Sequence, residues 1–148
     1  MRILILNGPN LDLLGTREPH IYGSVSFDEH FATMRALFPD QELRYAQSNV
    51  EGELVELLRK SVSEVDAVVF NPAGYSHTSV ALRDTITVIG RPVVEVHISN
   101  IHGREEFRHR SVTGGACVGV ITGFGLEGYN MAVRHLVQRG VSKADRSS

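Results

Sequence analysis

The sequence is poor in cysteine and lysine. Its 148 residues include a single cysteine, Cys117, so no disulfide can form within the chain, and a reducing compartment suits it. The two lysines are Lys60, which we expect on an exposed helix face, and Lys143, in a polar tail. A Schiff-base enzyme needs a buried lysine. We therefore do not expect imine chemistry.

Long apolar runs and an excess of one charge are also missing. No apolar stretch approaches the roughly 20 residues needed to cross a bilayer, and the first apolar run ends after Leu6, too early for a secretory signal. The formal net charge is −2 and the pI is about 6.4, which gives no reason to expect nucleic acid or an anionic membrane as a partner. We expect a soluble, cytoplasmic protein.

The motifs that hold metals and cofactors are lacking as well. Neither H-E-x-x-H nor paired cysteines occur, and there is no G-x-S-x-G, no Walker A, and no G-x-G-x-x-G after the first apolar run. Residues 8–15 lack the Ser/Thr-rich phosphate cradle that a flavin mononucleotide needs. Asn7 and Asn71 stand where a phospho-acceptor receiver domain needs acidic residues. We expect no metal and no cofactor.

What is present is the composition of an ordinary globular domain. Hydrophobic residues make up 42% and charged residues 22%. A domain of this length buries roughly 68–70% of the surface that its unfolded chain exposes, which is enough for a stable core. We expect one catalytic domain over residues 1–148, with a frayed tail at 141–148.

Short apolar runs rich in β-branched residues alternate with segments of helical periodicity. The predicted strands are Arg2–Leu6, Glu42–Gln47, Ala67–Phe70, Val93–Val96 and Cys117–Ile121. The predicted helices are Ser26–Phe38, which opens with an S-x-x-E capping box, Gly52–Ser63, Ser79–Ile89 and Leu126–Arg139. Strands separated by helices imply right-handed crossovers. We expect an α/β fold: a flavodoxin-like doubly wound sheet of five parallel strands, order 2-1-3-4-5, with helices on both faces.

One connection is unusually long. Residues 8–25 follow the first predicted strand, whereas such loops usually take about 2–6 residues, and long loops in compact domains are usually functional or disordered. The segment holds Asn10, Arg17, His20 and Tyr22. We expect it to form a lid over a site.

Polar residues follow three of the predicted strands. The first strand leads into Asn7–Asn10, the third into Asn71–His77 and the fourth into His97–Asn100. In open parallel sheets ligands bind beyond the carboxyl ends of the strands, at the switch in strand order. The predicted order places these three ends side by side, which indicates a site for a small polar molecule.

Two residue pairs there suit acid–base chemistry. Arg17 and Tyr22 share the lid, and a nearby positive charge favours the phenolate that a tyrosine base requires. Alternatively, Tyr22 packs under the loop and Arg17 is solvated. Glu95 and His97 are two residues apart on one strand, so their side chains share a face. The carboxylate can then prepare the imidazole as a general acid, although a structural ion pair has the same spacing.

Other polar residues leave more than one interpretation open. His77 is as well placed to begin a helix as to bind a ligand. Asp84 is expected on an exposed helix face. Arg104, Arg108 and Arg110 form either a solvated charged run or, with one of them turned inward, a binding group for a carboxylate. Three further histidines are expected at the surface: His102, His109 and His135.

Four segments together resemble type II 3-dehydroquinate dehydratase. They are LNGPNLDLLGTREPHIYG at Leu6–Gly23, FNPAGYSHTSVALRD at Phe70–Asp84, EVHISNIHGREEFRHRS at Glu95–Ser111 and GVITGFGLEGY at Gly119–Tyr129. The resemblance covers nearly the whole chain in the expected order. It implies a lyase that converts 3-dehydroquinate to 3-dehydroshikimate in the shikimate pathway, towards chorismate and the aromatic amino acids, without metal or cofactor.

The resemblance also implies roles for individual residues. Tyr22 matches the base that removes a proton beside the ketone, and Arg17 the lid residue that sustains the tyrosinate. Asn10 matches the amide that stabilises the enolate oxygen. His97 matches the acid that protonates the departing hydroxyl, with Glu95 as its orienting partner. These pairings are chemically coherent, because a weakly acidic proton needs both a base and oxyanion stabilisation.

Binding positions follow in the same way. Asn71, His77 and Arg108 fall on substrate-binding positions, as do the backbone amides of Ile98 and Ser99.

Asp84 matches an acid that completes the neighbouring subunit's site, which implies trimers assembled into a dodecamer. Asp12 departs from the asparagine common in relatives, and we expect it to have only a modest effect on turnover.

Two other functions remain open at this stage. One is a flavodoxin-like small-molecule-binding module without catalysis, and the other is a different lyase or isomerase of a carboxylated ring ketone. The absent flavin cradle and receiver acids weigh against the first, and the lid favours catalysis.

Overall fold

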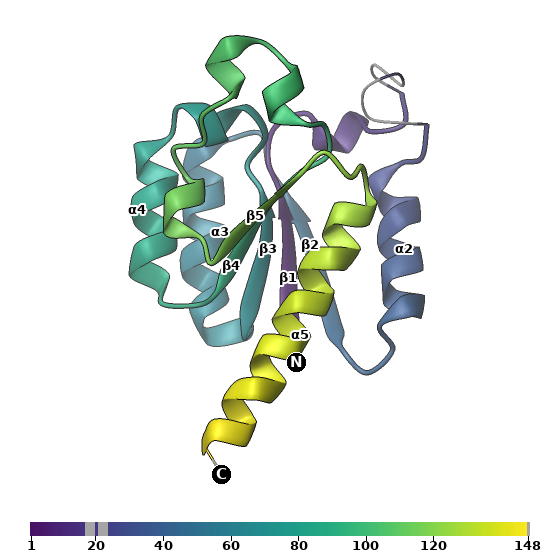
Figure 1. The fold of residues 1–148 in the computed structure, drawn as a ribbon, viewed down its shortest axis with the longest axis vertical. Helices are drawn as coiled ribbons and strands as arrows, with labels where there is room; N and C mark the ends of the chain where they lie inside the picture. Colours follow the sequence, from purple (N-terminus) through teal and green to yellow (C-terminus); the bar gives the residue numbers. More distant parts are fainter. Residues whose placement is uncertain (17–19, 21–23, 148) are drawn as a thin grey trace.

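A five-stranded parallel sheet forms the centre of the molecule (Figure 1). The computed structural model describes residues 1–16, 20 and 24–147, and the side chains within that range up to residue 140. The strands are β1 (Arg2–Asn7), β2 (Glu42–Gln47), β3 (Ala67–Asn71), β4 (Val93–His97) and β5 (Gly119–Thr122). Their order is β2-β1-β3-β4-β5, and all neighbours are parallel. The predicted fold class is confirmed.

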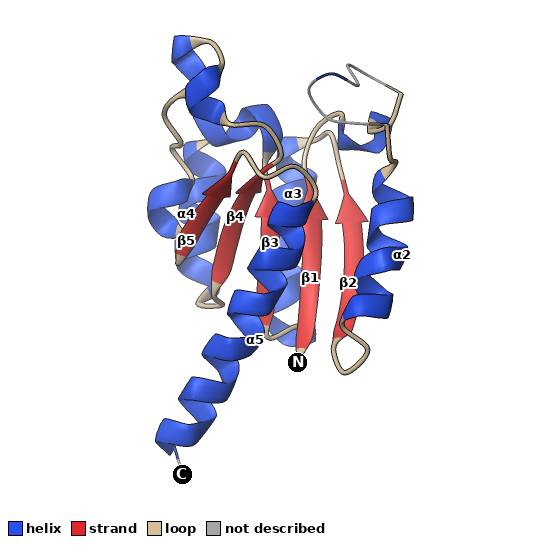
Figure 2. Ribbon diagram, turned by 45° about the vertical axis from the view of Figure 1, so that its right-hand side comes forward, coloured by secondary structure: helices blue, strands red, loops and turns tan. Residues whose placement is uncertain are grey.

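Helices cover both faces of the sheet (Figure 2). One face packs against α2 (Phe27–Leu37) and α5 (Glu127–Ser147), and the other against α3 (Glu51–Glu64) and α4 (Val80–Ile89). No helix in the described part of the chain is long and apolar enough to span a membrane.

Alternation along β1 supplies both layers. Ile3 and Ile5 belong to the core under α2 and α5, while Leu4 and Leu6 belong to the core under α3 and α4. This is the period of two expected when successive side chains of a strand point to opposite faces. Each fully buried aliphatic side chain of this size stabilises the fold by about 1.5–3 kcal/mol.

Side-chain caps begin two of the helices. Ser26 accepts a hydrogen bond at Oγ from the backbone N–H of Glu29 at 3.2 Å, as the capping-box motif predicts. Ser79 caps α4 in the same way, accepting from the backbone N–H of Leu82 at 2.9 Å. Both caps satisfy donors that the first helical turn leaves without a partner.

The observed bounds differ from the prediction in a consistent way. β1, β3 and β4 each extend one residue further, to Asn7, Asn71 and His97, because these polar residues are buried and still pair within the sheet or at its end. β5 begins at Gly119 instead of Cys117, since a 3₁₀ turn at Gly114–Ala116 and a bend come directly before it, and this edge strand is partly exposed, not covered on both faces.

The C-terminal helix is longer than its apolar pattern. α5 runs to Ser147, past the predicted end at Arg139, because its helical backbone continues after Leu136, the last core residue among the side chains described up to residue 140. The side chains of 141–148 lie outside the described set, so the fraying of this tail remains a prediction.

The first part of the long connection is anchored to the sheet. It forms the 3₁₀ turn η1 (Leu11–Leu13), and Leu11 and Leu14 are buried in the core under α2 and α5. The N–H of Gly8 donates to the carbonyl of Asn71 at 2.7 Å. A Cβ atom at Gly8 would lie 2.6 Å from the carbonyl oxygen of Pro72, so only glycine allows this approach.

Candidate active site

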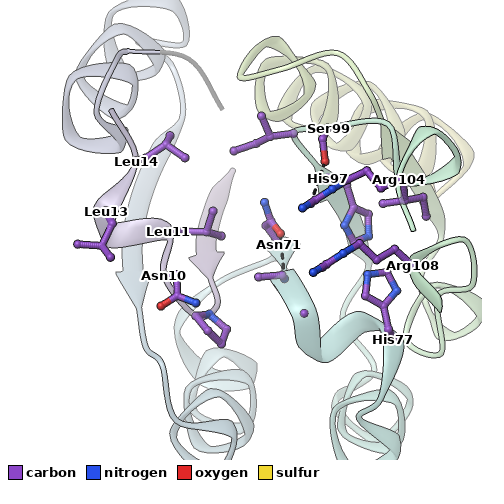
Figure 3. A pocket seen from close by; sticks show the side chains of 15 residues that line it. Asn10, Leu11, Leu13, Leu14, Asn71, His77, His97, Ser99, Arg104 and Arg108 are labelled. Carbon is purple, nitrogen blue, oxygen red and sulfur yellow. Dashed lines mark hydrogen bonds between the residues drawn. The ribbon is translucent and has the colours of Figure 1, made fainter. Parts of the chain in front are cut away.

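A pocket lies at the carboxyl ends of β1, β3 and β4, where the predicted strand order placed a site (Figure 3). It encloses about 570 Å³ of empty space, counting its open mouth. Its polar lining comes from Asn10, Asn71, His77, His97, Ser99, Arg104 and Arg108. Apolar side chains complete the lining: Leu11, Leu13, Leu14 and Ile101.

His97 is the last residue of β4 and is only 5% exposed. Its Nε2 lies 2.8 Å from Oε2 of Glu95, so the predicted contact between these two residues of one strand face is confirmed. With the Nε2–H donated to the carboxylate, Nδ1 is the nitrogen left to serve the pocket. That arrangement suits an imidazole that gives a proton to a ligand.

Three side chains hold the Glu95 carboxylate, which is fully buried. Besides His97, the hydroxyl of Ser111 donates to Oε2 at 2.6 Å and the hydroxyl of Thr113 donates to Oε1. Burial alone would raise the pKa of the Glu95 carboxyl, but the hydrogen bonds from His97, Ser111 and Thr113 outweigh it and lower that pKa. Glu95 is therefore a carboxylate at neutral pH, and its negative charge lies against Nε2 of His97.

Asn71 ends β3 next to Asn7 of β1 and is nearly buried. Its Oδ1 accepts from the backbone N–H of Ala73 at 3.0 Å, and its Nδ2 donates to the hydroxyl of Tyr129 at 2.8 Å. Ala73 has a φ of 54°, a left-handed backbone that this hydrogen bond supports. The Asn71 amide is thus held on the pocket wall from two sides.

His77 lies in the 3₁₀ turn η2 (Ala73–His77), and its ring stacks on that of His97 with centroids 6.2 Å apart. Its Nδ1 lies 2.8 Å from the carbonyl oxygen of Arg110 and therefore carries the proton. Burial, reinforced by the charges of His97 and Arg108, lowers the pKa of His77. At neutral pH its Nε2 is an acceptor, suited to a ligand hydroxyl.

A turn and two arginines form the wall beyond β4. The carbonyl of Ile98 accepts from the N–H of Gly125 at 2.9 Å, and that of Ser99 from the hydroxyl of Thr122 at 3.1 Å. Arg104 reaches the Ser99 hydroxyl at 3.4 Å.

Arg108 is the second arginine of this wall, and it pairs with Glu105 at 3.0 Å. Two guanidinium groups on one side of the pocket favour an anionic ligand.

Asn10 stands on the opposite rim, at the start of η1. Its φ of 69° is left-handed, and its backbone N–H donates to Oδ1 of Asn49 at 3.0 Å. Asn49 also accepts from Nε2 of Gln47, which in turn donates to the carbonyl of Gly8. The loop after β2 therefore fixes the backbone from which the Asn10 side chain projects.

The comparisons with known proteins agree with one another. The family model for class II dehydroquinase matches residues 1–137. The chain belongs to the class II dehydroquinase family.

Named relatives cover almost all of the chain. A 3-dehydroquinate dehydratase of Exiguobacterium sp. is 49% identical over 98% of this chain and 100% of its own length. One from Carboxydothermus hydrogenoformans is 48% identical over 93% of this chain and 90% of its own. The crystal structure of the type II dehydroquinase from Butyrivibrio crossotus superposes with a TM-score of 0.89 at 41% identity, covering 92% of this chain and 97% of that one.

Not every site residue predicted for this class II dehydroquinase lies in the pocket. Asp84 is exposed on α4 and is not among the pocket residues, as its helix-face position predicted. Glu95 lies behind His97 and does not line the pocket. Arg17 and Tyr22 lie outside the described residues, so their proposed pairing stays a prediction.

The sequence did not predict three contributors to the class II dehydroquinase site: Ser111, Thr113 and Tyr129. Arg104, Arg108 and Arg110 were predicted to be either a solvated charged run or, with one turned inward, a binding group, and both Arg104 and Arg108 line the pocket. Ser111 and Thr113 hold Glu95, and Tyr129 holds Asn71. Within the described residues no three His, Cys, Asp or Glu side chains are grouped so as to hold a metal ion.

Proposed function

We propose that this chain dehydrates 3-dehydroquinate to 3-dehydroshikimate through an enolate intermediate, as a hydro-lyase of the shikimate pathway. The observation that carries the proposal is the His97–Glu95 pair at the wall of a cation-rich pocket, in a chain of the class II dehydroquinase family. The substrate is a ring ketone that carries a carboxylate and hydroxyls. Its carboxylate suits the arginines, and its leaving hydroxyl needs an acid.

The acid step belongs to His97. As the carbon–oxygen bond to the leaving hydroxyl breaks, Nδ1 of a charged His97 gives up its proton and the hydroxyl departs as water. The buried Glu95 carboxylate stays bound at Nε2 and stabilises the charged ring before the transfer. Because Ser111 and Thr113 hold Glu95, the imidazole needs little reorganisation.

The base step belongs to Tyr22 on the lid. In this proposal the Tyr22 phenolate takes a proton from the carbon beside the ketone, and Arg17 sustains that phenolate by its charge. The negative charge that develops on the ketone oxygen is met by Asn10, directly or through a water. The proton gained by Tyr22 and the proton lost by His97 are then exchanged with solvent, which restores the resting enzyme.

The remaining pocket residues bind and orient the substrate. The amides of Ile98 and Ser99 hold the carboxylate, with the guanidinium groups of Arg108 and Arg104 beside them. Neutral His77 accepts a hydrogen bond from a substrate hydroxyl through Nε2, and Asn71 donates one from its amide.

The exposed position of Asp84 on α4 supports a role outside its own pocket. We propose that Asp84 completes the site of a neighbouring copy, in trimers that assemble into a dodecamer. We also propose that the enzyme works in the cytoplasm.

Product analysis tests the proposed reaction. Purified protein is incubated with 3-dehydroquinate, and mass spectrometry should find a product lighter by one water. Sodium borohydride, added with substrate, should neither inactivate the enzyme nor leave substrate attached to Lys60, because no imine forms. A product of unchanged mass would indicate an isomerase instead, and binding without any product would indicate a binding module.

A further inference from the structure

Three buried side chains next to the pocket are joined in a hydrogen-bonded chain. Nδ2 of Asn71 donates to the hydroxyl oxygen of Tyr129 at 2.8 Å, and that hydroxyl donates to Oδ1 of Asn7, also at 2.8 Å. Asn7 and Tyr129 are fully buried, and Asn71 is 3% exposed. Asn7 belongs to β1, Asn71 to β3 and Tyr129 to α5, so these hydrogen bonds join the sheet to the helix packed across it.

The hydrogen bonds of this chain can run in only one direction. The Tyr129 hydroxyl has a single proton, and that proton is committed to the carbonyl oxygen of Asn7. Tyr129 can therefore meet Asn71 only as an acceptor, which requires the NH₂ group of Asn71 on that side. Turning the Asn71 amide over would also bring its NH₂ against the N–H of Ala73, where Oδ1 now accepts.

Burial keeps the Tyr129 hydroxyl in its protonated form. Burial raises the pKa of Tyr129 far above its usual value, and the hydrogen bond donated by Asn71 offsets only part of that rise. The phenol consequently donates to Asn7 throughout the pH range in which the enzyme works, and its oxygen remains an acceptor for Asn71.

One N–H of the Asn71 amide is left for the pocket. Oδ1 serves Ala73 and the first N–H serves Tyr129, while the side chain forms part of the pocket wall between Leu11 and His97 (Figure 3). With its oxygen on Ala73 and one N–H on Tyr129, the amide plane is fixed and the second N–H has a set direction; with the Ala73 contact alone, the plane can swing and that direction is no longer set. A donor matches an acceptor oxygen of the substrate.

We propose that Tyr129 is a positioning residue, which fixes the Asn71 amide with its N–H towards the substrate and so sets the affinity of the pocket for an oxygen-bearing ring. The proposal rests on the function proposed above, because it assigns Asn71 to substrate binding. Tyr129 itself does not touch the substrate, since its hydroxyl is enclosed by Asn7 and Asn71.

The test is a double-mutant cycle in steady-state kinetics. Tyr129→Phe keeps the ring that packs edge-on against Phe27, at 4.9 Å between centroids, and removes the hydroxyl alone. Because one well-aligned hydrogen bond to substrate becomes intermittent, KM should rise about tenfold, while kcat changes less than KM. In an Asn71→Ala background the same substitution should leave KM unchanged, because the group it positions is gone.

The matched control is Ser61→Ala. This variant removes a buried hydroxyl of α3 that donates to the carbonyl of Leu58 at 2.6 Å, on the other face of the sheet from Tyr129. It should leave KM near the wild-type value. If Tyr129→Phe does not fold, Asn7→Ala is measured instead. It removes the acceptor of the Tyr129 hydroxyl proton, so the hydroxyl can turn, and KM should again rise, by less than tenfold.

Three results would overturn the proposal: an unchanged KM in Tyr129→Phe, an equal KM rise with and without Asn71, or an unchanged KM in Asn7→Ala where that variant is needed. Inactive wild-type protein would instead contradict the proposed reaction, so the two failures are distinguishable. A general loss of folding stability lowers the concentration of active enzyme and therefore the apparent kcat. It does not produce a change in KM that depends on the presence of Asn71.

Discussion

At the scale of single residues, the site is built on one buried carboxylate. Glu95 is fully buried, hydrogen-bonded by an imidazole and two hydroxyls, and its pKa is lowered despite burial. An isolated buried charge is costly, so its partners must be in place before it is tolerated. The resulting anion is directed at the ring nitrogen of His97 that faces away from the pocket.

Glu95→Gln tests this arrangement directly. The amide keeps the shape but removes the negative charge beside the His97 ring, so kcat should fall about 10- to 100-fold. The matched control is Ser111→Ala, which removes one hydrogen bond but leaves the charge and should have a smaller effect. A kcat of Glu95→Gln equal to that of the wild type would show that Glu95 has no part in the acid step.

Residue spacing predicted some of these contacts and not others. Glu95 and His97 share a face because a strand repeats every two residues, so their contact followed from local geometry. Ser111, Thr113 and Tyr129 reach the site from loops and a helix far along the chain. No periodicity determines such contacts, which depend on how the whole chain packs.

At the scale of elements, the packing of α2 against α5 places a histidine in the core. His30 of α2 is 9% exposed, and its ring lies beside those of Phe27 and Tyr129. Burial lowers the pKa of His30, although the charge of Glu127 and hydrogen bonds to the Leu126 backbone and the Asn130 side chain act in the other direction. His30 is therefore neutral in the folded protein near neutral pH.

This burial predicts a pH-dependent stability. Below about pH 6.5 the unfolded chain takes up a proton at His30, whereas the folded chain resists protonation there. The free energy of unfolding should therefore be at its full value above that pH and should fall as the pH decreases towards the lowered pKa. His77, whose pKa is also lowered, acts in the same direction. Urea unfolding at about pH 7.5 and about pH 5.5 measures the loss.

His30→Gln should reduce that loss, and His135→Gln, on the exposed side of α5, should not. Equal pH dependence in wild type and His30→Gln would mean that burial does not affect the ionisation of His30.

The elements themselves were largely predictable, because apolar periodicity reports burial. It failed where burial and secondary structure differ. β1, β3 and β4 continue through buried polar residues, β5 is an edge strand with little apolar burial, and α5 extends beyond its last core residue. The strand ends were thus least accurate at the residues that form the site.

At the scale of the whole molecule, each chain has one pocket lined by His97, and a carboxylate elsewhere on its surface faces outward. Asp84 is exposed on α4. Sequence resemblance, not the geometry of one chain, is what suggests that it serves a neighbouring copy. Closed symmetric assemblies repeat the same contact at every subunit, so one exposed acid can complete every site.

Subunit mixing tests the role of Asp84. Asp84→Asn and His97→Gln should each be nearly inactive alone, but random mixing should restore about one quarter of wild-type activity, because that share of sites has an intact His97 and an intact neighbouring Asp84. Mixing Glu95→Gln with His97→Gln is the control and should restore nothing, since both changes affect one subunit's site. Failure of the first mixture to recover would place Asp84 outside the neighbouring site.

The most direct measurement is the ultraviolet absorbance of the conjugated enone formed when 3-dehydroquinate is added to the purified protein. Wild-type protein should produce a steady rise without added metal or cofactor, and Tyr22→Phe should be slower by about 10²- to 10⁴-fold, because it lacks the base. No rise with the wild type would contradict the proposed dehydration, and a near-normal rate in Tyr22→Phe would contradict the tyrosine-base mechanism.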